Sequence, residues 1–172
     1  MFGSLSQLLS RMRDLGATRV YAKKLAPNDN SKNQIYLGGD FSVLNVIPHG
    51  EIYSDDEEKA GSKRERAKAR VTFFWVTGNG KYLAPDANLI LYPKYPEVRM
   101  SGFLKGCEDP PSEIMTVRDP GRVLVIGVTT DGEVLGYAAA ADNPVAREIE
   151  AGTWEQLGVF LELPARPDLK AS

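Results

Sequence analysis

Hydrophobic residues near the amino terminus recur at steps of three and four, which predicts an amphipathic helix over residues 4–15. Its apolar stripe consists of Leu5, Leu8, Leu9, Met12 and Leu15. Ser4 can cap the first turn of this helix, and Gly16 is placed to end it. A second short helix is expected over residues 144–151, because an Asn-Pro pair precedes it and a glycine follows it.

Between these helices, short runs rich in Val, Ile, Phe, Trp and Tyr are separated by turn residues, which predicts strands. The expected strands are residues 18–25, 34–37, 41–47, 68–77, 88–92, 97–104, 122–129, 133–139 and 157–163. Asp131-Gly132 is a strong hairpin signal, and residues 78–80 form another expected turn. The pattern favours a mainly β barrel or sandwich over residues 1–163, with two short helices plugging its ends. Residues 164–172 are expected to be a tail or the start of a linker to a further domain.

Composition narrows the class of protein. The chain has 172 residues, of which 42% are hydrophobic, so it can bury the core of one domain. No apolar run approaches the about 20 residues that a membrane-spanning helix needs, and the amino terminus lacks the residue order of a secretory signal. Cys107 and His49 are the single residues of their types, so we expect no disulfide within the chain, no Cys- or His-based metal site and no cofactor. These features favour a cytoplasmic protein.

The charge is distributed unevenly along the chain. Residues 1–105 contain 16 Lys and Arg against 11 Asp and Glu, whereas residues 106–172 contain 5 against 12. A basic first part favours a polyanionic partner more than the pI of 5.5 suggests. Residues 54–66 are expected to be an exposed, mobile loop. The basic run 59–70 is a candidate secondary phosphate contact, although such runs are usually solvated surfaces.

Residues 23–37 combine two lysines, a dense run of Asn, Asp, Ser and Gln, and then a strand signal. Asn and Gln can donate and accept at an adenine edge, and Lys can bind guanine or phosphate. The same composition is also typical of a turn-rich, solvated loop.

Residues 92–105 contain a second group of polar residues. In a strand, Glu97, Arg99 and Ser101 would share one face while Val98 and Met100 point to the other. Glu can accept from cytosine N4, and Arg can donate two hydrogen bonds to guanine, so this face could read C·G pairs. The alternative is an exposed strand with an ion pair on one face, worth about 0.5 kcal/mol.

Signatures of enzymes are weak. His49 lies between Pro48 and Gly50 in an expected turn, and the sequence has no phosphate-binding glycine loop and no Gly-x-Ser-x-Gly motif. Glu57-Glu58-Lys59 superficially matches the Glu-x-Lys of metal-dependent nucleases, but it lies in a charged stretch without apolar flanks.

The segment Val20–Ile47 resembles the start of the amino-terminal effector domain of EcoRII-type restriction endonucleases, through Lys23-Lys24-Leu25, Asn28-Asp29 and Gln34. Residues 95–101 are similar to the second recognition segment of that family, with Glu97 and Arg99 at its Glu-x-Arg positions. The chain also looks like the amino-terminal half of longer enzymes that end in an MvaI-type nuclease. The resemblance implies a DNA-binding pseudobarrel, an open barrel of seven or more strands with helices at its ends. Two arms would then clamp the major groove of a CCWGG-like target.

On this resemblance, the chain is expected to be a monomeric, non-catalytic module that binds double-stranded DNA, with a carboxy-terminal nuclease domain as its partner in a longer protein. The expected base contacts are Lys24, Asp29, Asn30, Asn33, Gln34, Lys94, Tyr95, Glu97 and Arg99. The expected backbone contacts are Arg19, Lys23, Ser31, Lys32, Ser101 and Lys105. The second arm is less basic than in the family, because Tyr95, Pro96 and Val98 take places that basic residues fill there.

Two other functions stay open from the sequence. One is a small magnesium-dependent nuclease that uses the carboxylates of Asp55–Glu58. The other is a β-barrel that binds a protein or peptide through the same two loops.

Overall fold

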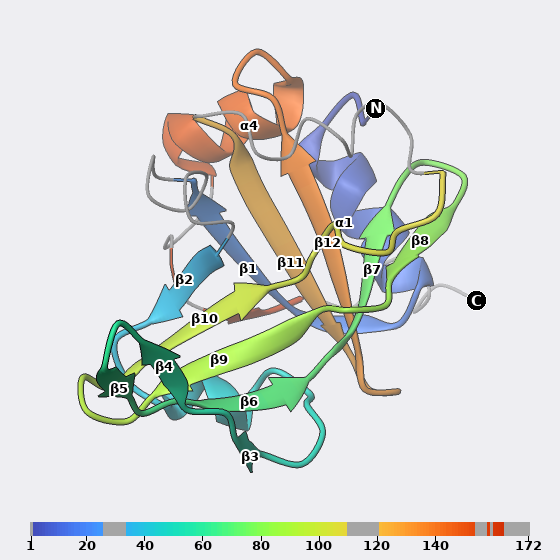
Figure 1. The fold of residues 1–172 in the computed structure, drawn as a ribbon. Helices are drawn as coiled ribbons and strands as arrows, with labels where there is room; N and C mark the ends of the chain where they lie inside the picture. The colour runs from blue at the N-terminus through green and yellow to red at the C-terminus, as the bar shows by residue number, and fades with distance from the viewer. Residues whose placement is uncertain (1, 26–33, 110–120, 154–157, 159, 164–172) are drawn as a thin grey trace.

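The structure, a computed structural model, describes residues 2–25, 34–109, 121–153, 158 and 160–163. Over these residues it is mainly β, with two sheets that do not close into a barrel, one separate hairpin and two α-helices (Figure 1). The expected open, mainly β fold with two short helices is therefore confirmed. Within the described residues, no helix is both long and apolar enough to span a bilayer.

The larger sheet has six strands in the order β13-β1-β11-β12-β7-β8. Its strands are β1 (Ala17–Lys24), β7 (Thr72–Val76), β8 (Lys81–Ala84), β11 (Val123–Thr129), β12 (Glu133–Ala139) and β13 (Leu161–Glu162). Neighbouring strands run antiparallel except β7 and β12, which are parallel. Every residue of β11 is buried, because both faces of the sheet are covered.

The smaller sheet has five antiparallel strands in the order β2-β10-β9-β6-β3. They are β2 (Gln34–Gly38), β3 (Tyr53–Ser54), β6 (Ala67–Arg70), β9 (Asn88–Tyr92) and β10 (Glu97–Ser101). Strands β4 (Glu57–Lys59) and β5 (Ser62–Arg64) form the separate hairpin. The inner faces of the two sheets share one apolar core, which includes Phe73, Trp75 and Ile126 from the larger sheet and Leu89 and Met100 from the smaller.

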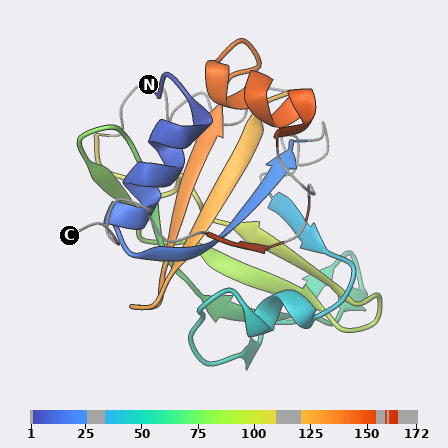
Figure 2. The same ribbon diagram turned by 180° about the vertical axis from the view of Figure 1, so that it is seen from behind.

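The helices pack on the outer face of the larger sheet (Figure 2), where a second apolar cluster forms, rather than between the two sheets. Helix α1 (Leu5–Asp14) buries Leu5, Leu8 and Met12, and the Ser4 hydroxyl accepts from the Gln7 amide at 3.1 Å. Helix α4 (Pro144–Glu148) begins after an Asn143 side chain that accepts from the Val145 amide, and it continues as the π-helical turn η2 (Ile149–Thr153). Both predicted helices are thus present with their expected caps.

Several predicted strands differ from the structure. Residues 41–47 contain the 3-10 helix η1 (Ser42–Asn45) rather than a strand. Here the Asp40 carboxylate accepts from the Ser42 amide at 2.8 Å, which starts a helical turn, and Val43 and Ile47 then both reach the core. Residues 68–77 form two strands, because the chain passes from the smaller sheet to the larger one at Val71. The sequence pattern does not predict strand β8, since its four residues carry little hydrophobic periodicity.

The charged stretch 54–66 is also more ordered than predicted. It contains part of β3 and the whole β4–β5 hairpin. Arg66 bridges the carboxylates of Asp55 and Glu57, and Lys63 pairs with Asp56 at 3.2 Å. Acidic residues before the turn therefore pair with basic residues after it, in a hairpin that lacks apolar anchors. The predicted tail, residues 164–172, lies outside the described residues.

Candidate nucleic-acid interface

Strand β10 has the alternation that its sequence predicts. Val98 and Met100 are buried in the core between the sheets, while the side chains of Glu97, Arg99 and Ser101 are half-buried on the outer face of the smaller sheet. Pairing with β2 and β9 fixes this orientation, because a slip of one residue would expose both core residues. The outer face of β10 therefore presents the three polar residues together.

Arg99 is the centre of a polar network on this face. One guanidinium nitrogen donates to Gln34 Oε1 at 3.1 Å, and another lies 2.8 Å from Glu97 Oε1. The Glu97 and Arg99 side chains are each 19% exposed, so solvent screens the pair less than it would a fully exposed pair. The ion pair that the sequence suggested on this face is therefore present, and with the hydrogen bond to Gln34 it joins three of the predicted base-contacting residues. The buried Arg99 Nε has no hydrogen-bond partner among the described residues.

Tyr92 supports Arg99 from the neighbouring strand. Its ring is almost fully buried, with the Arg99 guanidinium carbon 5.4 Å from the ring centre and that of Arg64 at 4.0 Å. Both distances are in the range of cation–π interactions. Arg64 ends the β4–β5 hairpin, so this hairpin contacts the strand next to the one that carries Glu97 and Arg99 through one aromatic ring. Nothing in the sequence pattern indicated this contact.

Lys23 lies at the same edge of the smaller sheet. Its ammonium group donates to the Tyr36 carbonyl oxygen at 2.8 Å and lies 5.5 Å from the Tyr36 ring centre. Tyr36 is the β2 residue opposite Arg99, so a residue of β1 is brought beside the Arg99 network. Two predicted contacts from the first arm, Lys23 and Gln34, therefore meet the second arm here.

The other lysine and arginine predicted near the first arm lie apart from this network. Lys24, at the end of β1, forms an exposed ion pair with Glu150 at 3.1 Å. Arg19 pairs in register with Glu162 of β13, and it lies four residues before Lys23, or about 13 Å along the strand. Arg19 therefore lies away from Lys23, the β1 residue that contacts the strand next to Arg99.

Lys94 and Tyr95 lie in the turn between β9 and β10. Tyr95 is 71% exposed, and the Lys94 ammonium group is 5.9 Å from its ring centre. An aromatic ring this exposed has little role in the core, so it is available to a partner. The remaining predicted contacts, Asp29, Asn30, Ser31, Lys32 and Asn33, lie outside the described residues.

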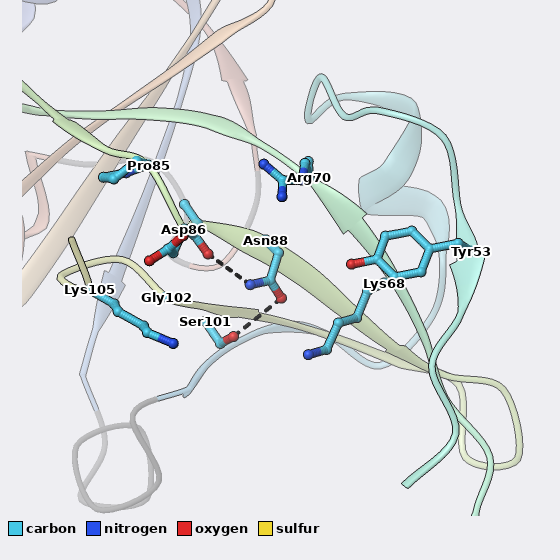
Figure 3. Close-up of a pocket in the computed structure, with 10 residues that line it drawn as sticks. Tyr53, Lys68, Arg70, Pro85, Asp86, Asn88, Ser101, Gly102 and Lys105 are labelled. Atoms are coloured by element: carbon cyan, nitrogen blue, oxygen red, sulfur yellow. Dashed lines mark hydrogen bonds between the residues drawn. The ribbon is translucent and has the colours of Figure 1, made fainter. Parts of the chain in front are cut away.

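Beyond Ser101, the outer face continues into a pocket of about 330 Å³ (Figure 3). The Ser101 hydroxyl donates to Asn88 Oδ1 at 3.3 Å, and the Asn88 amide donates to the Asp86 carbonyl oxygen at 2.9 Å. Lys105, a predicted backbone contact, also lines this pocket. Three other residues line the pocket: Tyr53, which the sequence pattern did not indicate, and Lys68 and Arg70, which belong to the run proposed as a secondary phosphate contact. The basic run 59–70 was the signal for the last two, but only strand pairing reveals that they lie beside Ser101.

The carboxylates of Asp55–Glu58 were the basis of the nuclease alternative. A hydrogen bond from Lys68 holds the pKa of Asp55 below its ordinary value, and one from Lys63 does the same for the pKa of Asp56. Among the described residues, no cluster of three or more His, Cys, Asp or Glu side chains could hold a metal ion. The structure therefore places at least two of these carboxylates in ion pairs with lysines.

No protein-family model matches the chain, and no curated protein matches it either.

Proposed function

We propose that this chain binds double-stranded DNA in a sequence-specific manner, through the outer face of the smaller sheet and the two arms that border it. The observation that carries the proposal is the network in which Gln34 and Glu97 fix the Arg99 guanidinium on an outward-facing strand. An arginine held in one orientation loses little side-chain entropy when it binds guanine in the major groove. Glu97 would accept from cytosine N4 beside it.

The surroundings of Arg99 support a polyanionic partner. Lys23 lies beside Tyr36 on one side, and Lys105 lies beyond Ser101 on the other. The exposed Tyr95 and Lys94 extend the same strand pair at its turn. Phosphate contacts from such lysines would set the register of the protein on DNA, and the network would then supply base discrimination.

The target and the partner domain follow from the resemblance to EcoRII-type effector domains. We propose a CCWGG-like duplex as the target and a nuclease domain, in a longer protein, as the partner that uses this recognition. The chain itself would act as a non-catalytic module, with residues 26–33 completing the first arm.

Fluorescence anisotropy tests the proposal. Labelled duplexes with CCWGG and with a scrambled sequence are titrated with protein at near-physiological salt, without magnesium. We expect about a hundredfold or greater preference for the cognate duplex. Arg99→Ala should abolish most of that preference, whereas Arg147→Ala, on the exposed side of α4, should leave it unchanged. Equal binding of both duplexes by the native protein would overturn sequence-specific reading of this target.

A cleavage assay separates the nuclease alternative. The same duplexes are incubated with protein and magnesium, and the products are resolved on a denaturing gel. Intact DNA is the expected result. Cleavage that Asp55→Asn abolishes would instead make the chain a nuclease in its own right.

A further inference from the structure

We propose that the pocket next to Ser101 is a binding site for a single phosphodiester group of the DNA backbone. This inference rests on the proposed function and assigns a second, sequence-independent contact to the same face. The pocket has three cationic residues, Lys68, Arg70 and Lys105, which come from two separate segments of the chain. Figure 3 shows their nitrogen atoms and the Tyr53 hydroxyl directed toward the space above Asn88.

Strand pairing builds the basic side of this pocket. Lys68 and Arg70 are alternate residues of β6, so their side chains share the outer face, while Ala69 between them is fully buried. Arg70 lies opposite Asn88 in the β6–β9 register, and Tyr53 lies opposite Lys68 in the β3–β6 register. These positions cannot shift without moving the whole sheet.

Close backbone packing builds the other side. Gly102 has φ of +69°, and a Cβ atom there would lie only 2.1 Å from the Asp86 carbonyl oxygen. The next residue, Phe103, is buried, and its carbonyl oxygen accepts from the Trp75 indole at 2.6 Å. The backbone is therefore fixed to the core at Phe103, two residues before Lys105. This contact holds the backbone of Lys105 beside the pocket.

The charges in the pocket favour an anion. Lys68 is paired with Asp55 at 3.2 Å, and Asp86 is the only acidic residue among the described residues that line the pocket. The side chains of Arg70 and Lys105 are exposed and have no hydrogen bond or ion pair with any described residue. Two cations thus remain for a ligand, and the Tyr53 hydroxyl and the second N–H of the Asn88 amide can add hydrogen bonds. A phosphate oxygen suits both kinds of donor.

The location of the pocket close to Arg99 favours a phosphodiester group of a duplex over a free phosphate as its ligand. Ser101 on the pocket floor is two residues from Arg99 on the same strand, or about 7 Å. The pocket is also open to solvent on the face that carries the proposed base contacts, so a long polymer can lie across both. A backbone phosphate can therefore enter the pocket while Arg99 lies against a base edge.

Salt dependence measures this contact directly. Affinities for the cognate and scrambled duplexes are determined at several salt concentrations for native protein, Arg70→Gln, Lys105→Gln and the double variant, with Arg147→Gln as the matched control. Each single change should weaken both duplexes by the same factor and lower the slope of log affinity against log salt. The double variant should lower this slope by about one, because Arg70 and Lys105 neutralise the same single phosphate. Urea unfolding of each variant confirms that the fold is retained.

The outcomes separate this inference from the proposed function. If cognate preference persists and the salt slopes of both variants match that of the control, the phosphate site is refuted while base reading stands. If the native protein shows no cognate preference but the slopes fall as expected, base reading fails and the phosphate contact stands.

A second measurement identifies the source of the phosphate. Neutral methylphosphonate is placed at successive positions of the duplex, and one position should weaken binding by native protein without further weakening the double variant. In a separate arm, inorganic phosphate is added to the free protein and amide chemical shifts of residues 101–105 are followed. Saturable binding of inorganic phosphate, together with no sensitive methylphosphonate position, would assign the pocket to a free phosphate and overturn the proposal.

Discussion

Replacing Arg99 tests the recognition network most directly, because this residue makes two polar contacts and one ring contact at once. In Arg99→Ala, the Glu97 carboxylate, which is 19% exposed in the native protein, loses a partner at 2.8 Å. Exposed pairs contribute about 0–1 kcal/mol, and breaking a fully buried pair costs about 3–5 kcal/mol. We therefore expect Arg99→Ala to lower the free energy of unfolding by about 1–2 kcal/mol, between these two limits.

Arg99→Ala should reduce the preference for cognate DNA by more than it reduces the free energy of unfolding. A bidentate contact from arginine to guanine is worth about 1–3 kcal/mol, which is about a 5- to 150-fold loss of cognate affinity. A double-mutant cycle with Glu97→Gln separates the two effects, since this second change removes the ion pair but keeps the side-chain shape. The coupling energy between the two sites should be about 1 kcal/mol in urea unfolding.

Anisotropy with both duplexes and urea unfolding supply the whole cycle. An equal loss of affinity for cognate and scrambled DNA in Arg99→Ala would refute base reading by this arginine. Coupling near zero in the unfolding cycle would refute the claim that the ion pair stabilises the free protein.

Three further predictions concern the surroundings of the network. Arg64→Ala removes the ring contact at 4.0 Å and should lower cognate preference by about 0.5–1 kcal/mol in anisotropy without changing the salt slope, and an unchanged preference would separate the hairpin from recognition. Gly102→Ala should destabilise the fold by about 2 kcal/mol or more in urea unfolding, because it forces a methyl group against a backbone oxygen at positive φ, and near-native stability would contradict this. Asp55 has a lowered pKa, first through its hydrogen bond from Lys68, so its stabilising effect is complete above the ordinary value of 3.8 and is lost as the pH falls through the lowered pKa. Urea midpoints measured from about pH 5 to about pH 2.5 should therefore fall less steeply for Asp55→Asn than for the native protein, and identical curves would exclude this contribution.

Local pattern was sufficient where an element is a continuous apolar run between turn residues or alternates strongly. The predicted bounds of β9 and β12 match the structure, because both runs are apolar and end at clear turn residues. The alternation in residues 97–101 also placed Glu97 and Arg99 on one face correctly. Pattern failed over residues 41–47, where the Asp40 side chain redirects the backbone into a helical turn although the apolar residues suit a strand.

The missed parts of the site depend on contacts between segments far apart in the sequence. Arg64 and Tyr92 meet only because the hairpin folds over β9, and no local spacing reports that contact. The sequence shows Lys68 and Arg70 as members of a basic run. Such a run has the same composition whether it is solvated or lines a pocket, so composition alone did not place them in the site. Their role depends on the β6–β9 register, which no short-range signal encodes.

In the proposed complex, the division into two sheets would let the two arms act together. The first arm starts at the end of β1 in the larger sheet and ends at Gln34 in the smaller sheet, whereas the second arm lies wholly within the smaller sheet. The distance between Lys23, at the end of β1, and Arg99, in β10, is therefore set by the core between the sheets, where Trp75 of the larger sheet donates to the backbone just after β10. Close packing of that core transmits small displacements rather than absorbing them. Residues that never touch DNA would thus control whether Lys23 and Arg99 reach their contacts at the same time.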